Sequence, residues 1–285
     1  MRLVYLGTPA MAVPPLHALV AAGHDVALVV TRPDKRRGRG SGVAPSPVKA
    51  AALALALPVS HDVEDVLEVD AELGVVVAFG RIIKPHVLAA LPMVNVHFSL
   101  LPRWRGAAPV ERALLAGDTE TGVGIMAVAE GLDEGGVYAE RTVPIGGRTT
   151  AAELRDELVT VGTELLVDTL DVPLGTPRAQ VGEVTYAAKI DPAELAIDWA
   201  RPAIELDRLV RLGGAWTTLR GKRLKVHGAE PVAEAVGAPG AIDGDIVTTG
   251  DGGLRLIDVQ PEGKSAMPWS AFANGARPTE HDRLG

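Results

Sequence analysis

The residues best suited to chemistry in this sequence lie on one predicted strand. From residue 94 to Pro102, the polar Asn95, His97 and Ser99 alternate with apolar side chains before the chain breaks at proline. Because successive side chains of a strand point to opposite faces, these three polar groups share one face. An amide and an imidazole placed in this way can both donate hydrogen bonds to a carbonyl oxygen, which predicts a site that stabilises negative charge on that oxygen.

A glycine-rich turn at residues 130–136 carries a second candidate group, the carboxylate of Asp133. Glycines free such a turn from regular pairing, so we expect Asp133 to reach His97. Two plainer interpretations stay open from the residues alone. Asn95 and His97 could satisfy only buried backbone groups, and the turn could be an ordinary hairpin with exposed acids.

Alternating strands and helices are predicted to position these groups. Short apolar runs predict strands at residues 3–6, 26–30, 74–79, 94–98 and 122–128, and helical patterns cover 14–22, 47–54, 109–116 and 151–170. Ser46 is the expected N-cap of the second helix, and Thr150 with Glu153 has capping-box spacing before the fourth. This order indicates an α/β domain with a mostly parallel sheet, whose ligands lie beyond the carboxyl ends of the strands.

The pattern changes near the end of this domain. Residues 191–202 show little periodicity, and brief strand-like pieces at 224–226, 246–249 and 254–259 follow, separated by glycine-rich turns. The sequence therefore predicts a catalytic domain at 1–188, a linker at 189–204 and a small β-rich domain at 205–285.

Composition and missing motifs narrow the function further. The chain has 285 residues, 47% of them hydrophobic, and no cysteine, which excludes disulfides, thiolate nucleophiles and cysteine-ligated metals. No basic leader and no run of about 20 apolar residues is present, so we expect a cytoplasmic protein without a membrane segment. There is no G-x-G-x-x-G, G-x-S-x-G or H-E-x-x-H motif, which disfavours dinucleotide, hydrolase and metal chemistry.

The net charge of -8 hides two basic islands. Residues 32–39 hold five basic residues and one acid, and residues 201–227 hold seven basic residues and two acids. An acidic chain with two such islands is typical of a locally directed anion binder, with solvated surface charge as the alternative.

These motifs resemble those of the folate-dependent formyltransferases. The likeness covers most of residues 1–190. It rests on Asn95-x-His97-x-Ser99-Leu100-Leu101-Pro102, Arg103-Trp104-Arg105-Gly106, Gly131-Leu132-Asp133, the opening Gly7-Thr8-Pro9, the Gly38-Arg39-Gly40 loop and Thr185-Tyr186-Ala187.

The resemblance implies a Rossmann-like catalytic domain and a small OB-like β-barrel at the C-terminus. It further implies that 10-formyltetrahydrofolate is the co-substrate and that the formyl group passes to the α-amine of methionine on initiator tRNA, for translation initiation. By the same resemblance, the catalytic residues are Asn95, His97 and Asp133, the folate-binding residues are Ser99, Leu100, Leu101 and Pro102, and the tRNA-binding residues are Arg36, Arg37 and Arg39. We expect a monomer that uses no metal.

Two stretches depart from the family pattern. After Asp133 the family usually continues with a glycine and then an aspartate, whereas this chain has Glu134-Gly135-Gly136, so a bracing carboxylate is missing and a looser Asp133 is expected. The usual Asn-Pro-Trp-Pro is absent at 211–216. Two other functions stay open: formyl transfer to a sugar nucleotide or glycinamide ribonucleotide, and ligand binding by a Rossmann-like module without catalysis.

Overall fold

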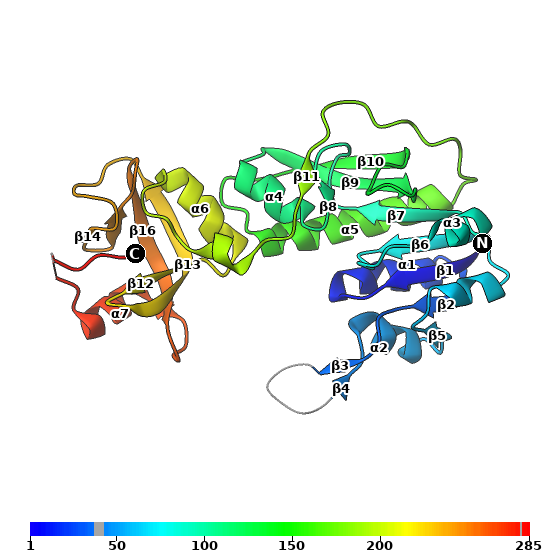
Figure 1. Ribbon diagram of the computed structural model, residues 1–285, viewed down its shortest axis with the longest axis horizontal. Coiled ribbons are helices and arrows are strands. Elements are labelled where there is room, and N and C mark those ends of the chain that lie inside the picture. The colour runs from blue at the N-terminus through cyan, green and yellow to red at the C-terminus, as the bar shows by residue number, and fades with distance from the viewer. Residues whose placement is uncertain (37–42, 280) are drawn as a thin grey trace. The chain divides into compact units, whose positions relative to one another are not determined.

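The apolar runs of the N-terminal half form one seven-stranded sheet in the computed structural model, which describes residues 1–36, 43–279 and 281–285 (Figure 1). The strand order is β10-β9-β7-β6-β1-β2-β5, with β9 and β10 antiparallel at one edge and the others parallel. The strands are β1 (Arg2–Gly7), β2 (Asp25–Val30), β5 (Val59–Ser60), β6 (Leu73–Val77), β7 (Met93–His97), β9 (Glu120–Ala127) and β10 (Val137–Pro144).

Helices and short strands surround this sheet. The helices are α1 (Val13–Ala21), α2 (Pro47–Ala54), α3 (Pro85–Ala90), α4 (Pro109–Ala116) and α5 (Ala151–Leu170), with 3-10 turns η1 (Ala10–Ala12) and η2 (Glu64–Glu68). Two small ribbons pair β3 (Lys35–Arg36) with β4 (Val43–Ala44) and β8 (Arg105–Gly106) with β11 (Tyr186–Ala187). The α/β prediction with a mostly parallel sheet is confirmed.

Predicted helix caps are present at two of these helices. The Ser46 hydroxyl accepts a hydrogen bond from the backbone N–H of Lys49 at 3.0 Å, which begins α2. At the start of α5, Thr150 Oγ1 accepts from the N–H of Glu153 at 3.2 Å, and Glu153 Oε2 accepts from the N–H of Thr150 at 2.9 Å. Both motifs satisfy N–H groups that lack partners within the helix.

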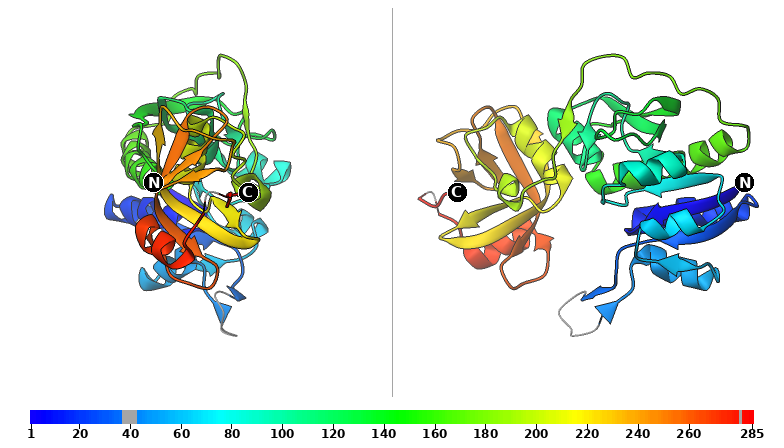
Figure 2. Two further views of the ribbon diagram at one scale, coloured as in Figure 1. Left: turned by 90° about the vertical axis from the view of Figure 1, so that its left-hand side faces the viewer. Right: turned by 45° about the vertical axis from the view of Figure 1, so that its right-hand side comes forward.

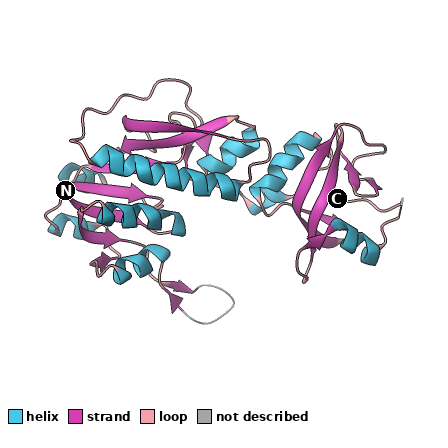
Figure 3. Ribbon diagram, turned by 180° about the vertical axis from the view of Figure 1, so that it is seen from behind, coloured by secondary structure: helices cyan, strands magenta, loops and turns pink. Residues whose placement is uncertain are grey.

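Helix α5 covers the face of β7 opposite the polar one. A Cβ atom on its Gly162 would lie 3.2 Å from Val96 and 3.5 Å from Phe98, so the helix packs closely on these apolar side chains. Figure 3 shows α5 running along the sheet. Because side chains alternate along β7, Asn95 and His97 face away from α5.

Contacts within the chain divide it into two units (Figure 2). Unit 1 contains Met1–Val110, Glu120–Pro144 and Arg155–Ala188, and unit 2 contains Glu111–Thr119, Ile145–Leu154 and Lys189–Gly285. No helix within the described residues is long and apolar enough to cross a membrane.

An antiparallel sheet forms the centre of unit 2. Its strand order is β12-β13-β16-β15-β14, and β17 pairs with β16. These strands are β12 (Trp216–Leu219), β13 (Lys222–Val232), β14 (Ile242–Asp243), β15 (Ile246–Thr248), β16 (Gly253–Pro261) and β17 (Met267–Pro268), with η3 (Pro192–Leu195), α6 (Ala203–Leu212) and α7 (Trp269–Ala276). The chain end connects both edges of the sheet, because Leu284 bridges Leu219 and Arg283 bridges Ala241. The predicted barrel-like β domain is thus present.

The segment expected to be a linker differs from the prediction. Ile197 and Trp199 are buried in the core of unit 2, and the Trp199 indole donates a hydrogen bond to Thr217 Oγ1 at 2.9 Å. Helix α6 then begins at Ala203 and buries Leu206 and Leu209 in the same core. Apolar burial therefore makes residues 189–204 an integral part of unit 2.

Candidate active site

His97 ends strand β7 and is buried, with 4% of its surface exposed. Its Nε2 atom lies 3.0 Å from the backbone carbonyl oxygen of Trp104. A carbonyl can only accept a hydrogen bond, so Nε2 carries the proton of the neutral ring. The other ring nitrogen, Nδ1, is then unprotonated and lies 3.6 Å from Asp133 Oδ2.

Asp133 is held close to this nitrogen by the chain around it. Its Oδ2 atom accepts a hydrogen bond from the backbone N–H of Gly106 at 2.8 Å. Strand β9 runs antiparallel to β7 and pairs Ala127 with Val94, so the turn after β9 begins at the far end of β7. The turn must therefore fold back to bring Asp133 to His97.

Asn95 lies two residues before His97 on the same face of β7. Its backbone pairs with Met126 and Val76, and its side chain is partly exposed. Within the described residues, the Asn95 side chain makes no hydrogen bond to the protein. Its amide is available to a ligand beside the histidine and the carboxylate.

Burial and charge act in opposite directions on His97. Removal from water lowers the pKa of its imidazole, while the Asp133 carboxylate and the Trp104 carbonyl raise it to a smaller extent. The net direction is downward, so the neutral ring dominates near pH 7. In that state Nδ1 and Asp133 form a pair of proton acceptors.

The predicted folate-binding stretch is mostly interior. Ser99 is fully buried and donates a hydrogen bond to the carbonyl of Arg103 at 2.6 Å. Leu101 packs with Met126 and Val137, and Pro102 is also buried, whereas Leu100 is partly exposed. Ser99 thus shapes the turn that presents the Trp104 carbonyl to His97.

The two basic islands are placed differently. Arg36 lies in β3, whereas Arg37 and Arg39 fall outside the described residues. In the second island, three arginines are paired with carboxylates: Arg201 with Glu205, Arg211 with Asp207, and Arg220 with Asp282. Three of the seven basic side chains of the second island therefore form ion pairs within unit 2.

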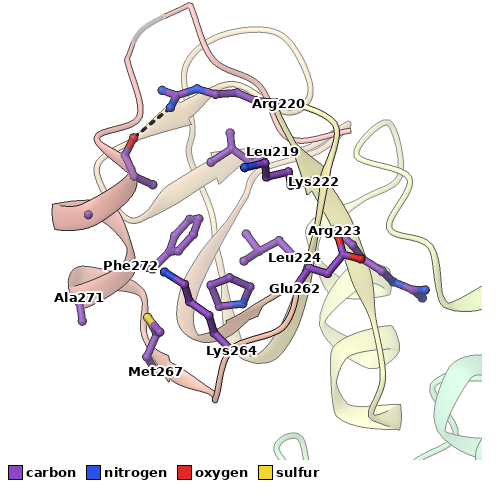
Figure 4. A pocket seen from close by; sticks show the side chains of 13 residues that line it. Leu219, Arg220, Lys222, Arg223, Leu224, Glu262, Lys264, Met267, Ala271 and Phe272 are labelled. Carbon is purple, nitrogen blue, oxygen red and sulfur yellow. Dashed lines mark hydrogen bonds between the residues drawn. The ribbon is translucent and has the colours of Figure 1, made fainter.

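A cavity of about 420 Å³ lies in unit 2 between β13, the β16–β17 turn and α7 (Figure 4). Leu224, Met267 and Phe272 give it an apolar lining, and its charged lining residues are Arg220, Lys222, Arg223, Lys264 and Glu262.

Three contact residues near Asn95, His97 and Asp133 were not predicted as site residues. Arg105, Gly106 and Gln180 all bind the turn that carries Asp133. Arg105 and Gly106 lie in a motif that carried the family resemblance, but nothing in the spacing of Gln180 indicates a role. Only the fold brings it close.

A Rossmann-like sheet with this polar triad, followed by an antiparallel domain, defines a transferase of the formyl transferase class. The chain belongs to this family: the Formyl transferase domain matches residues 1–170, and the Formyl transferase C-terminal domain matches residues 189–277.

Curated relatives match over nearly the whole chain. The methionyl-tRNA formyltransferase of Roseobacter denitrificans is 46% identical over 295 residues, covering 97% of this chain and 96% of its own. That of Symbiobacterium thermophilum is 45% identical over 303 residues, covering 96% of this chain and 92% of its own. The family prediction is confirmed.

Solved structures share the fold at lower identity. An N-formyltransferase from Helicobacter canadensis, in complex with folinic acid and dTDP-3-aminofucose, has a TM-score of 0.69 at 18% identity and covers 91% of this chain and 98% of that one. HypX from Aquifex aeolicus, in complex with tetrahydrofolic acid, has a TM-score of 0.65 at 18% identity and covers 96% of this chain and 47% of that one.

Proposed function

We propose that this chain transfers the formyl group of 10-formyltetrahydrofolate to the α-amine of methionine on initiator tRNA. The observation that carries the proposal is the 3.6 Å approach of His97 Nδ1 to Asp133 Oδ2 beside the available amide of Asn95. Relatives that are 43% to 46% identical bear the name methionyl-tRNA formyltransferase, which supports this acceptor.

The proposed reaction begins when the neutral α-amine attacks the formyl carbon. The new C–N bond pushes the carbonyl electrons onto oxygen, and the nitrogen becomes positively charged. His97 Nδ1 is unprotonated in the resting site and can accept the proton that leaves this nitrogen, either directly or through water. Asp133 stabilises the resulting imidazolium by its negative charge.

Collapse of the tetrahedral intermediate completes the reaction. Asn95 donates its amide N–H to the oxyanion, and protonated His97 offers a second, charge-assisted donor. The electrons on oxygen re-form the carbonyl as the bond from carbon to the folate nitrogen breaks. The imidazolium returns its proton to that nitrogen, which yields tetrahydrofolate and the formylated amine.

Substrate binding is proposed for the segments around this centre. Leu100 is the partly exposed side chain of the 99–102 stretch, so folate contact is assigned to Leu100 and to the backbone of Ser99, Leu101 and Pro102. Arg36, Arg37 and Arg39 are assigned to tRNA phosphates, with the lysines of the unit 2 cavity as a second contact. We further propose that the protein is cytoplasmic and monomeric. Sedimentation of the purified protein would test the monomeric state.

The direct test measures labelled formyl transfer from 10-formyltetrahydrofolate to charged initiator tRNA. Parallel reactions offer a dTDP-amino sugar and glycinamide ribonucleotide as acceptors. Transfer to the tRNA alone is expected. Exclusive transfer to either small acceptor would replace the proposal with the alternative formyltransferase, and transfer to none would favour a binding module.

The assignment of Arg36, Arg37 and Arg39 to tRNA binding has a separate test. Replacement of Arg36, Arg37 and Arg39 by alanine removes three positive charges, which should raise the KM for tRNA and make the salt dependence of tRNA binding shallower. The KM for folate should stay the same. An unchanged salt slope would place these arginines outside the RNA contact.

A further inference from the structure

Gln180 lies between two segments that position the groups of the proposed active site. One is strand β8 with Arg105 and Gly106, and the other is the turn with Asp133. We propose that Gln180 is a positioning residue that fixes the Asp133 turn against His97, so that turnover depends on its amide although it does not touch substrate. This inference rests on the proposed function.

The Gln180 amide uses both of its ends. Its Nε2 group donates to the backbone carbonyls of Asp133 at 2.7 Å and Gly135 at 2.8 Å. Its Oε1 atom accepts from the Arg105 guanidinium, at 3.1 Å from Nε and 2.7 Å from Nη2. Reversing the amide would set donors against donors and acceptors against acceptors, so the orientation follows from its partners.

The segment that carries Gln180 is itself anchored on both sides. Arg178 forms a two-bond backbone bridge with Val137, with N···O distances of 2.8 and 2.9 Å. Thr185 Oγ1 accepts from the N–H of Trp104 at 2.8 Å, and the Thr185 carbonyl accepts from the N–H of Arg105 at 2.9 Å. Gln180 therefore lies in an irregular segment that is anchored at Arg178 and at Thr185.

The Asp133 turn needs such support because of its own backbone. Asp133 has a φ of +50°, in the left-handed region that residues other than glycine adopt infrequently. The carbonyls on either side of Glu134 are the ones that Gln180 binds, so its amide holds this conformation. The backbone N–H of Gly106 then donates a hydrogen bond to Asp133 Oδ2.

Gly136, where this turn departs from the family pattern, is consistent with the proposed role of Gln180. A Cβ atom on Gly136 would lie 3.0 Å from the carbonyl oxygen of Arg178 and 3.0 Å from Pro177 Cβ. The turn thus packs tightly on the segment that carries Gln180, with little room for a carboxylate at 136. Gln180, Arg105 and Gly106 each contact this turn, and the expectation of a looser Asp133 stays a prediction.

Two variants separate the donor function of Gln180 from its bulk. Gln180→Met keeps a similar length and removes all hydrogen bonds, whereas Gln180→Glu keeps an acceptor for Arg105 and removes both donors. Each should lower kcat by about 10- to 30-fold, since both variants lose the two hydrogen bonds that Gln180 donates to the turn. The KM values for folate and tRNA should change little. If the Met variant fails to fold, the Glu variant decides.

A double-mutant cycle tests whether the effect passes through Asp133. In an Asp133→Asn background, Gln180→Glu should cost less than about 2-fold in kcat, because the positioned carboxylate is already gone. The matched control is Gln260→Glu, the same chemical change at an amide that donates to the Lys264 carbonyl at 2.8 Å in unit 2. Its kcat should equal that of the wild type.

Three results would overturn the inference: wild-type kcat in Gln180→Glu, losses that multiply in the Asp133→Asn background, or an equal loss in Gln260→Glu. Failure of the proposed function is a different result. In that case the unmodified protein itself transfers no formyl group to charged initiator tRNA.

Discussion

The substitution Asp133→Asn removes a negative charge from the active site while keeping the shape of the side chain. An asparagine oxygen can still accept the N–H of Gly106, which Asp133 Oδ2 binds at 2.8 Å. The turn should therefore keep its place. What is lost is the charge that stabilises protonated His97, whose Nδ1 lies 3.6 Å away.

The structure gives the size of this effect. Unit charges 3.6 Å apart attract by about 4 to 5 kcal/mol at an effective dielectric constant of about 20. The Asp133 side chain is 16% exposed, so solvent screens part of this attraction. We expect kcat to fall by about 100-fold or more, since each 1.4 kcal/mol is a factor of about ten.

The assay is formyl transfer to charged initiator tRNA, run with thermal unfolding of the same samples. The pKa of His97, followed by NMR, should fall further in Asp133→Asn, because the carboxylate is the larger of the two influences that raise it. Turnover near the wild-type level, or an unchanged pKa of His97, would refute the role of Asp133.

Asn95→Ala and His97→Ala should each reduce turnover by about 100-fold or more with the fold intact; near-normal turnover in both would place the oxyanion elsewhere. Thr150→Ala removes the N-cap of α5 and should lower the free energy of unfolding by about 1 kcal/mol, measured in urea; no change in the unfolding midpoint would contradict it. Hydrogen bonding to Arg112 lowers the pKa of Glu194 to about 2. Because this folded-state pKa is depressed, the stabilisation is complete above about pH 4.5 and is lost as the pH falls toward 2. The free energy of unfolding of Arg112→Ala should therefore change less steeply with pH between about 4.5 and 2 than that of the wild type.

Local sequence patterns determined much of the fold. The helices at 47–54, 109–116 and 151–170 have the predicted bounds, because proline, capping residues and terminal glycines act within one turn of the chain. Alternation along β7 likewise determined that Asn95 and His97 share a face. Helix α6 was not predicted, although its buried Ala203, Leu206, Leu209 and Val210 recur at helical spacing and its sequence is amphipathic.

The geometry of the site came from the tertiary structure. Three contacts define it: His97 with the Trp104 carbonyl, His97 with Asp133, and Gln180 with the Asp133 turn. Each contact depends on how separate segments pack. The turn after β9 folds back toward His97 because β9 pairs antiparallel with β7, and the sequence did not predict this pairing. Sequence thus determined which groups are present and which face they occupy. Long-range packing decided the protonated nitrogen of His97 and the position of its carboxylate, because hydrogen bonds between distant segments form only in the folded chain.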